Sequence, residues 1–157
     1  MKIQRIQGIK EANECFVMGK EMHEESSFRD LMFDEEAILH YAFLSMQPDS
    51  DLYAAMCVLD SGEAIGFMFG GVESFFFSPT QKLAHDYALY IRKAHRNTMN
   101  ARGAILLLKD FEHWAKSKRV VRIQLGITTG IAEEKTMKLY NKLGYVSLGQ
   151  LFFREVI

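Results

Sequence analysis

The sequence predicts a mixed α/β fold in which a mostly antiparallel sheet has helices on both of its faces. In four segments apolar residues recur every three to four positions, which is typical of amphipathic helices. Between these segments lie alternating or β-branched runs, and short turns rich in Gly, Pro, Asp and Ser separate the runs. The order is a strand, two helices, three antiparallel strands, a helix, a strand, a helix and final strands. Elements in this order bury their apolar faces by layering helices on a sheet.

The amino-terminal part predicts one strand followed by two helices. Residues 2–7 alternate polar and apolar side chains, and residues 9–23 have a helical period. Asp34 suits the amino-terminal cap of the second helix, which Pro48 stops. The loop between the two helices, residues 24–33, has no period.

The middle of the chain predicts a hairpin and a third strand. Residues 52–59 and 64–77 are two strand-like runs joined by a short Asp-Ser-Gly-Glu turn. Glycines within the second run predict a bulge or the close approach of another backbone. A Ser-Pro-Thr sequence at 78–80 should end this run, and residues 83–91 should form the next strand.

The carboxyl-terminal part predicts a helix on each side of one strand, then two closing strands. Their ranges are 104–118 (helix), 120–128 (strand), 132–143 (helix), 146–148 (strand) and 151–156 (strand). The last helix ends with a lysine in its final turn and with Gly144, which tolerates positive φ. The crossover through the first of these helices should make its two flanking strands parallel neighbours.

The composition is that of an ordinary globular protein, and we expect residues 1–157 to form one domain. Hydrophobic residues make up 48% and charged residues 25%, which excludes disordered, collagen-like and disulfide-scaffold classes. The formal net charge of −1 predicts neither nucleic acid nor an anionic membrane as a partner. Cys15 and Cys57 lie among apolar neighbours, which favours free buried thiols in a reducing compartment. With no signal-peptide or membrane-spanning pattern, we expect a cytoplasmic protein.

Residues 137–145, MKLYNKLGY, resemble the closing signature of the GNAT superfamily of acyl-CoA-dependent N-acyltransferases, in which a helix with Leu-Tyr ends at Lys-x-Gly-Phe/Tyr. The family also has Gln/Arg-x-x-Gly-x-Gly/Ala where the preceding helix begins. In one register Met99 stands at the Gln/Arg position and Arg102 at the central glycine; in the other, Arg96 is the basic residue and the loop is longer. Both registers remain open.

The start of that preceding helix is the candidate site for an anionic ligand. Its first turn leaves backbone N–H groups free, has small side chains and adds a guanidinium, all of which suit a pyrophosphate. A packing role for the glycine and alanine in this turn is the equal alternative. The resemblance implies that the ligand is acetyl-CoA, with its pantetheine arm along the strand before the loop. The implied cofactor-binding residues are Leu89, Tyr90, Ile91, Arg96, Ala101, Arg102, Gly103, Ala104, Thr129 and Lys142.

Four residues are candidates for the chemistry of acyl transfer. The resemblance implies that Tyr140 donates a proton to the departing thiolate; the alternative is a half-buried packing residue. Attack by an amine on a thioester also needs a proton acceptor, for which His85, Asp86 and Glu73 are candidates, although for each of them an exposed strand position without a catalytic role is the more common case. No histidine has a partner at metal-ligand spacing, so we expect no metal site.

The amine acceptor should lie against the unpatterned loop between the first two helices, where Glu25, Phe28 and Arg29 are candidate substrate-binding residues. The sequence therefore predicts an N-acetyltransferase that moves an acetyl group from acetyl-CoA to a primary amine in a ternary complex. Two other readings remain open. One is a catalytically silent acyl-CoA-binding or assembly protein with the same fold. The other is an interaction protein that forms a homodimer through Phe75–Phe77 and its carboxyl-terminal strand.

Overall fold

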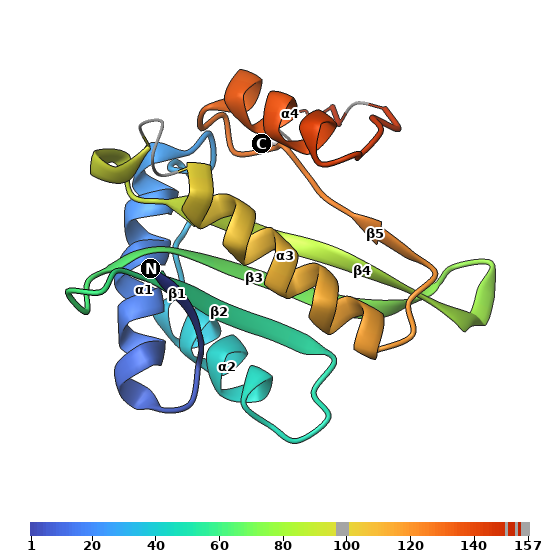
Figure 1. The fold of residues 1–157 in the computed structure, drawn as a ribbon, viewed down its shortest axis with the longest axis horizontal. Coiled ribbons are helices and arrows are strands. Elements are labelled where there is room, and N and C mark those ends of the chain that lie inside the picture. Colours follow the sequence, from blue (N-terminus) through green and yellow to red (C-terminus); the bar gives the residue numbers. More distant parts are fainter. Residues whose placement is uncertain (97–100, 150, 153, 155–157) are drawn as a thin grey trace.

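The computed structural model describes residues 1–96, 101–149, 151, 152 and 154. Up to the last helix, its elements follow the predicted order (Figure 1). The elements are β1 (Lys2–Arg5), α1 (Ile9–Glu25), α2 (Glu35–Ser45), β2 (Leu52–Val58), β3 (Ala64–Phe75), β4 (Ser78–Ile91), a 3-10 turn η1 (Lys93–His95), α3 (Ala101–Ser117), β5 (Arg122–Gln124) and α4 (Glu133–Lys142).

Within the described residues, one five-stranded sheet joins the strands in the order β1-β2-β3-β4-β5. The first four strands pair antiparallel, and β5 pairs parallel to β4 after the crossover through α3. The prediction of a mixed, mostly antiparallel sheet is confirmed, and so is the parallel crossover.

Helices cover both faces of this sheet (Figure 1). Because successive side chains of a strand point to opposite faces, β2 supplies Tyr53, Ala55 and Cys57 to one core and Ala54, Met56 and Val58 to the other. The first core is closed by α3 and by Tyr140 from α4, and the second by α1 and α2. Cys15 and Cys57 are buried free thiols, as predicted.

Local signals in the sequence explain where two helices begin and end. The Asp34 side chain accepts a hydrogen bond from the Ala37 backbone N–H at 3.2 Å, which confirms it as the cap of α2. Gly144 follows α4 with a φ of +89°, a left-handed conformation that suits glycine.

The glycine-rich run of β3 confirms the predicted bulge and close approach. Phe69 pairs with Ala88 whereas Gly70 pairs with Asp86, so Tyr87 is the extra residue of a bulge in β4. A Cβ at Gly70 would lie 2.6 Å from the ring of Phe111 on α3, so only glycine fits there. Because Tyr87 adds one residue to β4, the alternation of side chains between the two faces of the sheet shifts by one position at the bulge.

Several predicted boundaries are wrong. The segment 78–80 does not end a strand but begins β4, because the β3–β4 hairpin turns tightly at Phe76 and Phe77. In β5 only three of the nine predicted strand residues pair, since the chain leaves the sheet after Gln124. Helix α3 begins at Ala101, three residues before the predicted start.

The closing strands are also corrected. Residues 146–148 form no strand, and neither do the described residues of 151–156; the remaining positions of that range lie outside the described residues. Val146 and Leu148 are exposed, so no packing stabilises the extended pairing that their pattern favoured. At the hairpin tip, Phe76 and Phe77 are 88% and 81% exposed. The homodimer interface through Phe75–Phe77 stays a prediction.

Candidate active site

A cleft opens where β4 and β5 separate. Their parallel ladder runs from the pair of Leu83 with Arg122 to the pair of His85 with Gln124. One step further, the Asp86 side chain accepts a hydrogen bond from the Gly126 backbone N–H at 2.7 Å, and beyond it the chains diverge. The cleft is lined by Asp86, Tyr87, Ala88, Leu89, Tyr90, Ile91, Arg96, Ala104, Gly126, Ile127, Thr128, Thr129, Ile131, Ala132, Lys135, Thr136, Leu139 and Tyr140.

One wall of the cleft is the free edge of β4. Past His85, this edge has no strand partner among the described residues, yet the strand continues to Ile91. The stretch from Asp86 to Ile91 is about 17 Å long at the rise of an extended chain. A free strand edge presents backbone N–H and C=O groups that an extended, amide-containing ligand can bind.

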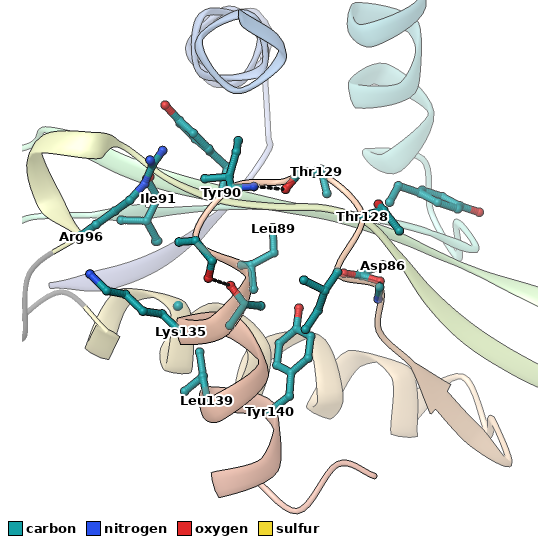
Figure 2. Close-up of a pocket in the computed structure, with 18 residues that line it drawn as sticks. Asp86, Leu89, Tyr90, Ile91, Arg96, Thr128, Thr129, Lys135, Leu139 and Tyr140 are labelled. Atoms are coloured by element: carbon teal, nitrogen blue, oxygen red, sulfur yellow. Dashed lines mark hydrogen bonds between the residues drawn. The ribbon is translucent and has the colours of Figure 1, made fainter. Parts of the chain in front are cut away.

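Tyr140 and Asp86 lie at the inner end of the cleft (Figure 2). Tyr140 is 6% exposed, and burial, reinforced by the negative charge of Asp86, raises the pKa of its hydroxyl well above the ordinary value. At neutral pH this phenol therefore keeps its proton and can act as a hydrogen-bond donor.

Asp86 is the ionisable partner at this end. Burial raises the pKa of its carboxyl group to about 6, against the opposing effect of hydrogen bonds from the backbone N–H groups of Gly126 and of Asp86 itself. At pH 7 the carboxyl is mostly ionised and has a pKa close to neutrality, as a general base requires. The inner end therefore combines a proton donor and a proton acceptor.

Two cationic residues, Arg96 and Lys135, lie at the opposite end of the cleft (Figure 2). Arg96 donates from Nε to the carbonyl oxygen of Ile91 at 2.6 Å and from Nη1 to a carboxylate oxygen of Glu25 at 2.6 Å. Its Nη2 is buried without a hydrogen-bond partner in the part of the chain that the structure describes. Ala104, from the first turn of α3, also lines the cleft, and the backbone N–H groups of this turn have no partner within the helix. This end suits an anionic group.

The first turn of α3 was predicted either to bind a pyrophosphate or to pack against the sheet, and its residues differ in their surroundings. A Cβ at Gly103 would lie 3.3 Å from the sulfur of Cys57, which favours the packing role for this residue. Arg102 is exposed, does not line the cleft, and lies near the β2–β3 turn, where its charge helps the N-terminal ammonium to lower the pKa of Asp60. Ala101 is the first residue of α3, and Met99 lies outside the described residues.

Three other predicted site residues do not line the cleft. His85 sits in the sheet between Gly71 and Gln124. Glu73 accepts a hydrogen bond from the Tyr87 hydroxyl at 2.9 Å on the exposed surface of β3. Lys142 is exposed in the last turn of α4. The structure brings together Asp86 and Tyr140, but not His85 or Glu73.

The three residues predicted to bind the acceptor also differ in their surroundings. Glu25 is bonded to Arg96 and to the hydroxyl of Tyr90, so its carboxylate is already paired. Phe28 and Arg29 are exposed and do not line the cleft.

Sequence reasoning missed several lining residues. Thr136 and Leu139 share a face of α4 with Tyr140, and helical spacing from Tyr140 could have identified them. In the segment 126–132 only Thr129 was predicted, because the place of the other residues depends on the departure of the chain from β5.

The sequence matches no family model and no curated protein. Solved structures do resemble the fold. The aminoglycoside N-acetyltransferase AAC(6')-Iy, in complex with a bisubstrate analogue of CoA and acetylneamine, has a TM-score of 0.72 at 14% identity over 99% of this chain and 97% of its own. A ribosomal-protein-alanine N-acetyltransferase from Brucella melitensis biovar Abortus 2308 has a TM-score of 0.66 at 14% identity over 98% of this chain and 97% of its own. An acetyltransferase from Trypanosoma brucei has a TM-score of 0.70 at 12% identity over 99% of both chains.

These likenesses extend over nearly the whole of each chain, so they concern the complete arrangement of strands and helices rather than a shared fragment. Sequence identities of 12–14% show the fold alone and do not identify the amine acceptor. The chain therefore has the fold of the GNAT N-acetyltransferases, as the resemblance in residues 137–145 predicted.

Proposed function

We propose that this protein is an N-acetyltransferase that moves an acetyl group from acetyl-CoA to a primary amine by direct attack in a ternary complex. The observation that supports it best is the cleft between the diverging β4 and β5, which has a donor and an acceptor of protons at its inner end and cations at its outer end. Two solved structures of one neighbour, the aminoglycoside N-acetyltransferase AAC(6')-Iy, contain CoA or a CoA-containing bisubstrate analogue.

The residues present fit acyl-CoA. The backbone of Leu89, Tyr90 and Ile91 would bind the amides of the pantetheine arm along the edge of β4. Arg96, Lys135 and the free N–H groups at the start of α3 would bind the phosphates. These contacts favour the register of the family motif in which Arg96, rather than Met99, stands at the Gln/Arg position.

Acetyl-CoA supplies a thioester, whose carbonyl carbon forms a bond to the amine nitrogen while its bond to sulfur breaks. Tyr140 would donate its proton to the sulfur, which makes the leaving group a thiol. Asp86, as the carboxylate, would accept a proton from the attacking amine. The proton gained by Asp86 and the one lost by Tyr140 balance, and exchange with solvent restores both groups.

The proposal is tested in two steps. CoA and acetyl-CoA should raise the melting temperature, because a ligand that binds only the folded state stabilises it. Thiol release should then be measured over a panel of primary amines that includes aminoglycosides and peptides with a free amino terminus. Absence of any shift with either ligand would refute acyl-CoA binding; a shift without turnover across the panel would favour the catalytically silent protein instead.

A further inference from the structure

The end of α1 contacts the β4 wall of the cleft. The carboxylate of Glu25 accepts hydrogen bonds from the Tyr90 hydroxyl at 2.6 Å and from Arg96 Nη1 at 2.6 Å. The side chains of Glu25 and Arg96 are 28% and 21% exposed, so this ion pair is partly open to solvent. Burial opposes ionisation of Glu25, but the hydrogen bonds from Arg96 and Tyr90 and the nearby positive charges bring its pKa below the ordinary value. Glu25 is therefore a charged anchor on this wall.

Two residues later, the same turn contacts the opposite wall. The backbone N–H of Ser27 donates to the carbonyl oxygen of Thr129 at 2.8 Å, and its hydroxyl donates to that of Thr128 at 3.2 Å. A Cβ at Gly130 would lie 3.7 Å from the Cβ of Ser27, so the two backbones are in close contact. Thr128 and Thr129 line the cleft on the segment that follows β5 (Figure 2).

Ser26, between the two anchors, fixes their spacing. It is 3% exposed. Its hydroxyl donates to the carbonyl oxygen of His23 at 2.9 Å and accepts from the backbone N–H of Phe28 at 3.1 Å. Buried hydrogen bonds of this kind hold a turn in one conformation. The distance between Glu25 and Ser27 is thus set within the turn itself.

We infer that residues 25–27 form a clasp that fixes the width of the cleft for acyl-CoA, with Glu25 and Ser27 as positioning residues. Beyond the hydrogen bond of Asp86 to Gly126, the β4–β5 ladder no longer sets the distance between the walls. The clasp joins the β4 wall to Thr128 and Thr129 on the opposite wall, so the two walls are held together before the ligand arrives. A site formed in advance binds more tightly because less ordering accompanies binding. This inference rests on the proposed function, since it assigns acyl-CoA to the cleft.

The test opens each arm of the clasp separately. Glu25→Gln removes the charge that pairs with Arg96, and Ser27→Pro removes the N–H that bonds to Thr129; Ser26 is already extended, with ψ of 170°, as a residue before proline should be. Glu24→Gln is the matched control, because Glu24 is exposed beside the clasp. Affinity for CoA is measured by calorimetry without an acceptor. Each clasp variant should bind CoA about ten-fold more weakly, and the control should bind like the wild type.

The double variant discriminates a clasp from two local contacts. Once the contacts of either Glu25 or Ser27 are lost, the remaining contacts no longer join the two walls. The double variant should therefore bind CoA about as weakly as either single variant. Multiplied losses would overturn the inference.

Hydrogen exchange provides a readout without ligand. Glu25→Gln acts on the β4 arm, yet it should speed amide exchange in residues 127–131 on the opposite wall. Unchanged exchange there would overturn the clasp even if Ser27→Pro failed to fold. If the wild type itself does not bind CoA, the proposed function fails; if the wild type binds and both variants bind equally well, only the clasp fails.

Discussion

Replacing Asp86 with asparagine should make the protein more stable and less active. Asparagine keeps the size of the side chain and an oxygen that can accept the hydrogen bond from the Gly126 N–H, but it cannot ionise. The native carboxyl is partly buried, and desolvation raises its pKa from 3.8 to about 6. The substitution therefore removes the cost of burying a negative charge.

The sign and size of the stability effect follow from the pKa shift. Because the folded-state pKa of Asp86 is raised, its protonated form stabilises the folded protein below about pH 4, and that contribution is lost as the pH rises to about 6. A shift of about two units corresponds to about 3 kcal/mol in the free energy of unfolding. The stability of Asp86→Asn relative to the wild type should thus grow by about 3 kcal/mol between pH 4 and pH 8.

The assay is urea unfolding of both ligand-free proteins across this pH range, together with steady-state kinetics. General acid-base groups contribute about a hundred-fold to ten-thousand-fold, so kcat of the variant should fall by that factor. In the wild type, kcat/KM should rise as the pH increases through about 6, and this rise should be absent in the variant. If the free energies of unfolding of the two proteins changed with pH in the same way, the raised pKa of Asp86 would be refuted. A stabilised variant with full activity would refute Asp86 as the base.

Three further predictions test the other parts of the site. Tyr140→Phe should lower kcat about a hundred-fold to ten-thousand-fold with little change in CoA affinity or melting temperature, and a variant with nearly full kcat would make Tyr140 a packing residue. Lys135→Glu should abolish most of the thermal shift with CoA, whereas Arg102→Glu, outside the cleft, should keep it; equal losses would refute the position given to the phosphates. Gly70→Ala should destabilise the protein by about 1–3 kcal/mol or more in urea unfolding, because its Cβ would lie 2.6 Å from the Phe111 ring, and a neutral effect would contradict this close packing.

The elements of the fold could be predicted because their signals are local. The cap at Asp34 and the stop at Gly144 each depend on backbone geometry within a few residues. The predicted strands after α4 were wrong for a related reason. An alternating pattern favours a strand only where a partner and a buried face exist, and Val146 and Leu148 are exposed.

The candidate site could be predicted only in part. The MKLYNKLGY motif identified Tyr140, and the position of the strand before α3 identified the stretch from Leu89 to Ile91. The sequence did not separate Asp86 from His85 as the candidate base. They are neighbours on one strand, and the choice depends on where β5 leaves the ladder, which happens one residue beyond His85.

The sequence by itself determined the order of strands and helices, the mixed sheet and the resemblance of the carboxyl-terminal helix to an acyltransferase signature. These features could be predicted because hydrophobic periodicity, helix caps and turns each depend on residues that are close together in the sequence. Only the tertiary structure decided which side chains share the cleft. It turned Arg102 away from the cleft and brought Arg96 and Lys135 to its outer end, and it joined Glu25 and Ser27 to opposite walls. These contacts join segments up to about a hundred residues apart, and their geometry depends on how the whole sheet is paired and twisted.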